Sequence, residues 1–248
     1  MLNSMCPQLS PTEVHIWSAH LDLPPDRIQS LAALLSEDEC ERADRFYKPT
    51  DRDAFIAARG ILRTLLGQYL NEHPAQVQLQ YQERGKPFLE GSSLEFNVSH
   101  SHGLALYAIA QSRRVGIDVE YVREIEVQAL AQRFFCDREF QQLQALPPDR
   151  QAAQFFQYWT AKEAYLKATG EGLAGLSQVE TIEVLTEDVP TLDLVCQEAA
   201  RWKLQQLDRI LGTGDYAAAV VAEGREWTLH YQTFDNGYYG LYWEPIAF

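Results

Sequence analysis

The predicted helices and strands follow the same order twice along the chain. A strand over residues 13–21 precedes helices, which give way to strands over residues 94–110. A further strand over residues 115–120 is followed by helices again, and then by strand-like runs toward the C-terminus. Runs of helices that alternate with runs of strands are typical of an α+β fold. We therefore predict an α+β chain with two halves of similar order, residues 1–112 and 113–248.

Local start and stop signals place the helices. Pro-Pro-Asp sequences begin at Pro24 and Pro147, and proline is well tolerated in the first helical turn. Ser36 and Thr50 are each followed three residues later by an acidic residue, the pattern of a capping box. Gly170 is a typical residue just past a helix C-terminus. These signals predict a short helix from Ser36 to near Tyr47, a longer one starting at Thr50, and a long one ending at Gly170.

Composition narrows the classes of function. The 248 residues carry 21 Lys and Arg against 35 Asp and Glu, a net charge of −14, which argues against binding nucleic acid or an anionic membrane. The N-terminus lacks a basic segment followed by an apolar run, so we expect no signal peptide and no membrane span. Four widely spaced cysteines without a CxxC pair argue against a zinc site or disulfides and favour a cytoplasmic protein: Cys6, Cys40, Cys136 and Cys196.

An acidic pair lies on the predicted strand over residues 115–120. Side chains two apart on a strand point the same way, so Asp118 and Glu120 share one face. The apolar residues Val115, Ile117 and Val119 take the other face. By itself this pattern also fits a strand with one solvated acidic face.

A second cluster lies on the long helix. Trp159, Glu163 and Lys167 are spaced four residues apart and therefore line one side of the helix. An ordinary surface Glu–Lys pair would have the same spacing and contribute only ~0.3 kcal/mol. Neither cluster carries a functional assignment alone.

Further polar and basic residues lie in the first half. The segment Asn97–His102 ends a strand in serines and histidines, which suits anion contacts as well as an ordinary turn. Lys86 lies in the turn Gly85-Lys86-Pro87, while Arg42 and Arg59 lie on predicted helices. Taken singly, helix-borne arginines are usually just solvated.

Together these motifs resemble the surfactin-synthetase-activator (Sfp-type) family of 4'-phosphopantetheinyl transferases. They occur in the family's order and at about its spacing: Gly85-Lys86-Pro87, Phe96-Asn97-Val98-Ser99-His100-Ser101, Val115-Gly116-Ile117-Asp118-Val119-Glu120, Arg133-Phe134-Phe135, and Trp159 through Gly170. The resemblance implies the family's fold of two pseudo-symmetric α+β halves with the active site between them. It also implies that the chain acts as a monomer.

The resemblance implies an activity with residue roles. The phosphopantetheine arm of coenzyme A would pass to a serine of an apo acyl, polyketide or peptidyl carrier protein. By their motif positions, Asp118, Glu120 and Glu163 would hold Mg²⁺. The expected catalytic residues are Asp118, Glu163 and Lys167, with Glu163 as the candidate general base. Coenzyme A contacts are expected from Arg42, Lys86, Ser99, His100 and Lys167, with Arg59 added from its neighbourhood.

Other interpretations remain open at this point. Glu39 stands where some relatives carry a basic residue, which removes one expected phosphate contact. The carboxylates also suit a magnesium-dependent nucleotide pyrophosphate hydrolase, and the chain could be a coenzyme A-binding module without activity. Phe134 and Phe135 beside Arg133 and Arg138 could offer a carrier-docking patch, or they could pack in the core.

Overall fold

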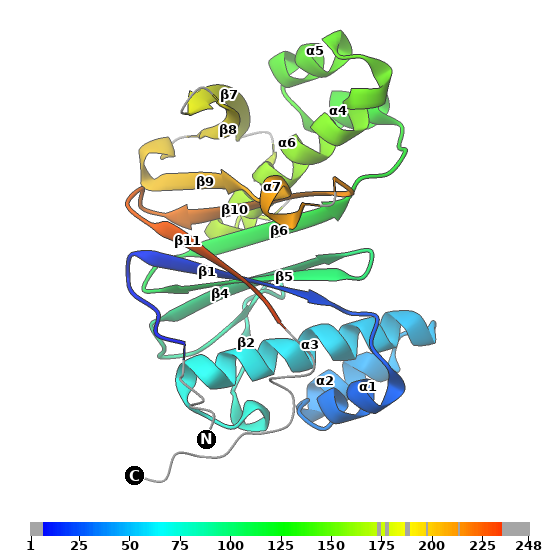
Figure 1. Ribbon diagram of the computed structural model, residues 1–248, viewed down its shortest axis with the longest axis vertical. Coiled ribbons are helices and arrows are strands. Elements are labelled where there is room, and N and C mark those ends of the chain that lie inside the picture. The colour runs from blue at the N-terminus through cyan, green and yellow to red at the C-terminus, as the bar shows by residue number, and fades with distance from the viewer. Residues whose placement is uncertain are drawn as a thin grey trace.

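The computed structural model describes residues 7–172, 175–176, 179–186, 189–196, 198–212 and 214–234. Two sheets lie face to face in the middle of the molecule (Figure 1). The first has the strand order β11-β1-β5-β4 and the second the order β6-β10-β9. Their strands are β1 (Glu13–His20), β4 (Leu94–Ser101), β5 (Leu104–Gln111), β6 (Val115–Tyr121), β9 (Trp202–Gln206), β10 (Tyr216–Glu223) and β11 (Thr228–Thr233).

Helices cover the outer face of each sheet (Figure 1). On the first sheet these are α1 (Pro25–Ala32), α2 (Glu37–Asp44) and α3 (Pro49–Leu70). On the second they are α4 (Val127–Phe134), α5 (Asp137–Ala145) and α6 (Pro148–Thr169). Smaller elements complete the described chain: η1 (Pro74–Gln76), β2 (Gln80–Tyr81), β3 (Pro87–Phe88), β7 (Glu180–Thr186), β8 (Val189–Val195), η3 (Ala199–Arg201) and α7 (Asp208–Leu211).

Strand alternation sorts the cores. On β6, Val115, Ile117 and Val119 face the first sheet and are buried in a cluster between the two sheets. The intervening residues therefore face α6. Gly116 is required there, because a Cβ atom would collide with the backbone of Ala164 and Ala168 on α6. This backbone contact brings the acidic face of β6 directly against the long helix.

The two halves share the same helix lengths, helix ends and capping boxes. Helices α3 and α6 each have 22 residues, begin with proline and end at a residue with left-handed backbone. Helices α2 and α5 each begin with a capping box whose glutamate is Glu39 or Glu139. Glu39 lies 2.5 Å from Arg63 of α3, and Glu139 lies 2.6 Å from Lys162 of α6. Each pair ties a short helix to a long one, and the expected α+β fold with two similar halves is confirmed.

Several local expectations were wrong. Helix α2 ends at Asp44 rather than near Tyr47, and α3 begins at Pro49, so Thr50 is inside the helix and caps nothing. After α3, η1 spans Pro74–Gln76, and the strand that follows it, β2, spans only Gln80–Tyr81. Arg63 is only 2% exposed, since its side chain pairs with Glu39 and donates to the carbonyls of Pro74 and Val77.

The last described strand returns to the first sheet. β11 pairs in parallel with β1, from Glu13 opposite Thr228 to Ser18 opposite Thr233.

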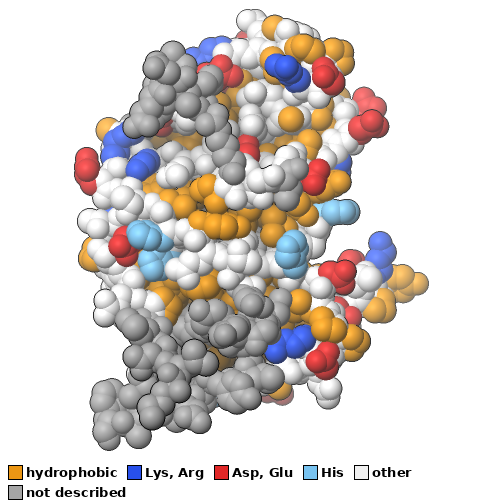
Figure 2. Space-filling model, in the orientation of Figure 1, with side chains coloured by type: hydrophobic (Ala, Val, Ile, Leu, Met, Phe, Trp, Pro, Cys, Tyr) orange, Lys and Arg blue, Asp and Glu red, His pale blue; other side chains and the backbone are white. Residues whose placement is uncertain are grey.

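On the face shown in Figure 2, basic side chains are scattered among acidic ones rather than gathered into one patch. None of the described helices is both long and apolar enough to cross a membrane. Cys40, Cys136 and Cys196 are free thiols, and Cys6 lies outside the described residues.

Candidate active site

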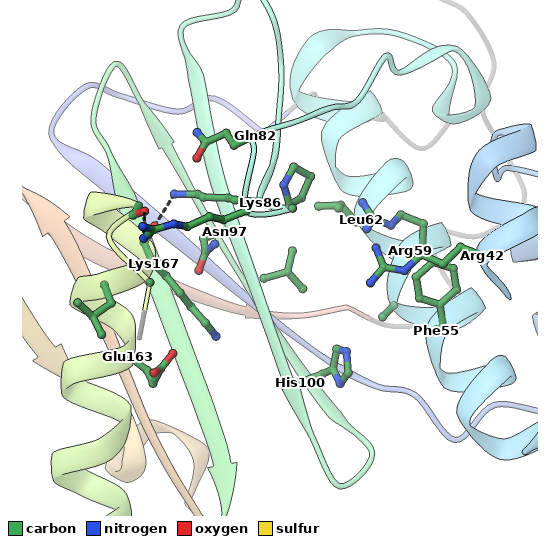
Figure 3. Close-up of a pocket in the computed structure, with 18 residues that line it drawn as sticks. Arg42, Phe55, Arg59, Leu62, Gln82, Lys86, Asn97, His100, Glu163 and Lys167 are labelled. Carbon is green, nitrogen blue, oxygen red and sulfur yellow. Dashed lines mark hydrogen bonds between the residues drawn. The ribbon is translucent and has the colours of Figure 1, made fainter. Parts of the chain in front are cut away.

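A pocket of about 360 Å³ lies between elements of both halves. Figure 3 shows Arg42, Phe55 and Arg59 on one side of it, with Glu163 and Lys167 of α6 on the other. The hairpin between β2 and β3 contributes its turn, and β4 contributes part of the wall. The residues lining the pocket include Arg42, Phe55, Arg59, Gln82, Arg84, Lys86, Asn97, His100, Glu163 and Lys167.

Lys167 joins the two expected clusters. Its Nζ lies 2.6 Å from Oδ1 of Asp118 and donates to Ser99 Oγ at 3.0 Å and to the Ile117 carbonyl at 3.2 Å. Ser99 Oγ in turn donates to Asp118 Oδ1 at 2.8 Å. The alternative interpretation, an ordinary Glu163–Lys167 ion pair on the helix surface, does not occur among the described residues. Lys167 reaches across to β6 instead, so the cluster belongs to the cleft rather than to a solvated helix face.

Asp118 is not on a solvated strand face. Only 4% of this residue is exposed, because α6 covers the face of β6 that carries it. Glu120, two residues further on, is half-buried; its Oε2 accepts a hydrogen bond from Ser101 Oγ at 2.9 Å and lies 3.6 Å from Arg123. The interpretation of the pair as a wet acidic surface is therefore wrong for Asp118. The two side chains do share one face of β6, opposite the face of Val115, Ile117 and Val119.

Two carboxylate oxygens near the pocket are buried without a hydrogen-bond partner. Asp118 Oδ2 and Glu163 Oε1 have no hydrogen-bond partner among the described residues. Burial raises the pKa of Glu163, and the negative charges of Asp118 and Glu120 raise it further, while Lys167 lowers it. A buried charged oxygen without a partner is unfavourable. A hard divalent cation that binds oxygen ligands would relieve both the desolvation and the mutual repulsion.

The acidic cluster is not a finished metal cage. Among the described residues, no three acidic, histidine or cysteine side chains already surround one point closely enough to hold an ion. Magnesium usually takes one or two carboxylates together with substrate phosphates and water, so it does not require an all-protein cage. One or two carboxylates of this cluster would therefore be enough for a metal that arrives with a phosphorylated ligand.

Positive charge surrounds the rest of the pocket. Lys86 Nζ donates to the carbonyls of Lys167 at 2.6 Å and Val115 at 3.4 Å, and burial lowers its pKa to about 8. The residue His100 is exposed, but its ring lines the pocket, where partial desolvation and then the charge of Lys167 lower its pKa. Arg59 is 9% exposed, and its Nη1 has no partner among the described residues although its Nε lies 3.4 Å from Glu39. These groups suit a ligand with several phosphates.

Several further residues that the sequence analysis singled out have defined contacts in the structure. Arg42 and Arg59 both approach the ring of Phe55, and both line the pocket. Glu39 is buried, forms ion pairs with Arg59 and Arg63, and is not among the residues that line the pocket. Phe134 packs against Trp159, and Phe135 against Phe155, so both rings serve the second core at least in part.

Sequence reasoning missed several pocket residues, among them Phe55, Gln82 and Arg84. Phe55 lies one helical turn before Arg59, and Gln82 and Arg84 lie in the same β2–β3 turn as Lys86. Their spacing from recognised residues was the available signal. Arg84 additionally donates to the Gly170 carbonyl at 3.3 Å, so it contacts the C-terminal end of α6.

Comparison with known proteins assigns the chain to a family. Residues 114–221 match the family model of the 4'-phosphopantetheinyl transferase superfamily, and residues 24–112 match the model described as 4'-phosphopantetheinyl transferase, N-terminal. The chain belongs to the 4'-phosphopantetheinyl transferase superfamily.

Similar proteins carry the same family name. The chain is 46% identical over 220 residues to the 4'-phosphopantetheinyl transferase HetI of Nostoc sp., covering 87% of this chain and 90% of HetI. It is 32% identical over 175 residues to the 4'-phosphopantetheinyl transferase psf-1 of Bacillus pumilus, covering 70% of this chain and 74% of psf-1. The 4'-phosphopantetheinyl transferase Sfp of Bacillus subtilis is 27% identical over 162 residues, covering 64% of this chain and 71% of Sfp.

Proposed function

We propose that the protein transfers the 4'-phosphopantetheine moiety of coenzyme A to a serine of an apo carrier protein and releases 3',5'-ADP. The observation that carries the proposal is the division of the pocket. Arginines, a histidine and a lysine line one part, and Glu163 and Lys167 of α6 line the other. Lys167 contacts Asp118, and Asp118 and Glu163 each have a buried oxygen without a partner among the described residues. A ligand with a phosphorylated nucleotide at one end and a reactive diphosphate at the other matches this charge pattern.

The roles of the residues follow from their positions. Arg42, Arg59, Lys86, Ser99 and His100 would bind coenzyme A. Asp118, Glu120 and Glu163 would hold Mg²⁺. Once bound, the ion would polarise the reacting phosphorus and neutralise phosphate charge.

The protein's own side chains would move the proton and steady the charge. The serine oxygen of the carrier forms a bond to the phosphorus that bears pantetheine, and the bond from this phosphorus to the oxygen of the 3',5'-ADP leaving group breaks. Glu163, which lines the pocket on α6 beside Lys167, would accept the serine proton directly or through a water molecule. Negative charge develops on the departing phosphate, where Lys167 would stabilise it.

A mass spectrum of a carrier protein tests the proposal. Apo carrier incubated with the protein, coenzyme A and Mg²⁺ should gain one phosphopantetheine group, and a carrier whose acceptor serine is alanine should gain none. Coenzyme A that is cleaved without any carrier would favour a nucleotide pyrophosphate hydrolase. Binding of coenzyme A without either reaction would favour a binding module.

The domain division, oligomeric state and location belong to the same proposal. Residues 1–112 would form the half that binds the nucleotide, and 113–248 the half that carries the acids and receives the carrier. One chain contributes both sides of the pocket, which supports a monomer. The expected location is the cytoplasm, where carrier proteins and coenzyme A would meet the enzyme.

Substitution of Glu163 by glutamine should separate stability from activity. At neutral pH the substitution removes a buried negative charge that lies near two other acids. In the presence of EDTA we expect the Tm to rise by a few degrees, because ~1 kcal/mol shifts the Tm of a chain of this size by roughly 2–4 °C. Transfer should fall to background. The exposed Glu124→Gln is the matched control, and an unchanged or lower Tm for Glu163→Gln would contradict the proposed repulsion.

Affinity for 3',5'-ADP should depend on pH through Lys86. Its folded-state pKa of about 8 lies below the unfolded value of 10.5, so Lys86 loses its proton as pH rises through 8. Because the unfolded chain then binds more protons than the folded one, stability itself rises from pH 8 to 10.5, opposite to the trend in affinity. The Kd should weaken up to about tenfold from pH 7 to 9, since roughly a tenth of a group remains charged one unit above its pKa. Calorimetric titration of the wild type and Lys86→Met checks this, and an equal pH dependence in the variant would refute it.

A further inference from the structure

Strands β4 and β6 meet between the two halves through side chains. They belong to different sheets, so no backbone ladder joins them in the described chain. Instead, alternate residues of β4 contact successive groups of β6. Asn97 Oδ1 accepts the Ile117 N–H at 2.9 Å, Ser99 donates to Asp118 at 2.8 Å, and Ser101 donates to Glu120 at 2.9 Å.

The direction of the Ser101 hydrogen bond is fixed by a third group. The backbone N–H of Tyr121 donates to Ser101 Oγ at 3.1 Å. A serine hydroxyl has one hydrogen to donate, and its oxygen is here an acceptor for Tyr121. Its hydrogen is therefore directed to Glu120 Oε2. Ser99 is arranged in the same way, since Lys167 Nζ donates to its oxygen and its hydrogen goes to Asp118.

The end of the β4–β5 hairpin holds this register. The ring of His102 stacks on Tyr121 with centroids 4.2 Å apart, and Tyr216 donates its hydroxyl to the His102 carbonyl at 2.8 Å. His102 has a φ of 46°, a left-handed conformation that is uncommon for a residue other than glycine. These contacts keep Ser101 opposite Glu120.

We propose that Ser101 is a positioning residue that holds the Glu120 carboxylate in the orientation needed for the metal. The inference rests on the proposed function, because it assigns Glu120 to Mg²⁺. Arg123 Nη1 lies 3.6 Å from the same oxygen of Glu120 and competes with Ser101 for this carboxylate. Without the Ser101 hydroxyl, the Glu120 side chain is free to turn toward Arg123. Ser101 would therefore act through Glu120, and it is not among the residues that line the pocket.

Metal affinity tests the role directly. Mg²⁺ is titrated calorimetrically into each protein saturated with 3',5'-ADP. Ser101→Ala should weaken the Kd for Mg²⁺ roughly tenfold, the lower end of the effect of losing a group that orients a metal ligand. Ser101→Thr retains the hydroxyl and should recover most of the affinity. Ser93→Ala removes an exposed hydroxyl just before β4 and should leave the Kd unchanged.

A double substitution separates positioning from general stability. In a Glu120→Gln background, Ser101→Ala should cause no further loss of Mg²⁺ affinity, because the group through which it acts has changed. If Ser101→Ala lowers only the Tm, or weakens Mg²⁺ equally with and without Glu120, the positioning role is overturned. If the wild type transfers phosphopantetheine with no added metal and binds no Mg²⁺, the metal part of the proposed function falls and the role of Ser101 with it. Normal Mg²⁺ binding by Ser101→Ala overturns the role of Ser101 alone.

Discussion

Replacement of Asp118 by alanine is expected to abolish transfer and to destabilise the protein at the same time. Asp118 is the one acidic residue of the site that contacts Lys167 and Ser99 together, and it carries an unpartnered buried oxygen suited to a metal. Loss of such a group should lower kcat by at least about 10²–10³-fold, as for a lost transition-state contact. Ser99 and Lys167 would lose their shared acceptor, which should lower the free energy of unfolding by about 1–3 kcal/mol.

Asp118→Asn separates these two effects. The amide has the same shape and its oxygen still accepts a hydrogen bond, but it lacks the negative charge that a divalent cation requires. We expect this variant to unfold at a temperature closer to that of the wild type and to remain inactive. Transfer assays with an apo carrier and thermal melts measure the two properties. Transfer by either variant at a rate near that of the wild type would rule out a metal role for Asp118.

The elements that carry the site were predictable because each depends on local sequence. The period of two on residues 115–120 placed Asp118 and Glu120 on one face, and β6 spans Val115–Tyr121. The Pro-Pro-Asp start and Gly170 bounded a helix that runs from Pro148 to Thr169. Local rules of this kind concern a few neighbouring residues and do not need the tertiary fold.

Burial and pairing were not predictable, because they depend on residues from the other half or from distant elements. The same acidic pattern on β6 fits a wet surface until α6 is known to cover it, and only the Gly116 contact with α6 reveals that cover. Lys167 has Glu163 four residues away, yet its closest acid is Asp118, 49 positions earlier. Similarly, Thr50 has the sequence of a cap, but Pro49 already begins the helix.

Both halves anchor their long helix in the same way, but only the second half carries the acids of the site. Both long helices are tied to a capping-box glutamate, through Arg63 in the first half and Lys162 in the second. The second helix alone approaches its sheet closely enough to require a glycine on the facing strand, Gly116. This close approach brings Glu163 and Lys167 to the acids of β6. The two lysines of α6 therefore differ in role: Lys162 pairs with Glu139 in the core, and Lys167 contacts Asp118 at the site. We infer that substitution of each lysine will separate the two roles.

Lys167→Met should impair catalysis far more than stability. The methionine keeps an unbranched side chain of similar length and removes the charge that faces Asp118 and the proposed diphosphate. We expect kcat to fall about 10²–10³-fold, the usual effect of losing one group that stabilises transition-state charge. Some stability should also be lost, because the side chain of its partner Asp118 is only 6% exposed. The loss should be smaller than for a fully buried pair, since Lys167 is 28% exposed and water can replace part of its pairing. Lys167→Arg keeps the charge in a different geometry and should recover only part of the rate.

Lys162→Met is the opposite case on the same helix. Its Nζ lies 2.6 Å from Glu139, and the two side chains are 1% and 0% exposed. Removing one partner of a buried ion pair destabilises a protein by about 3–5 kcal/mol, so the Tm should fall sharply. The transfer rate per folded molecule, measured well below that Tm, should stay near the wild-type value because Lys162 does not line the pocket. If instead Lys167→Met loses stability and keeps its rate, the cation beside Asp118 serves the fold, and charge stabilisation of the leaving phosphate must come from another residue of the pocket.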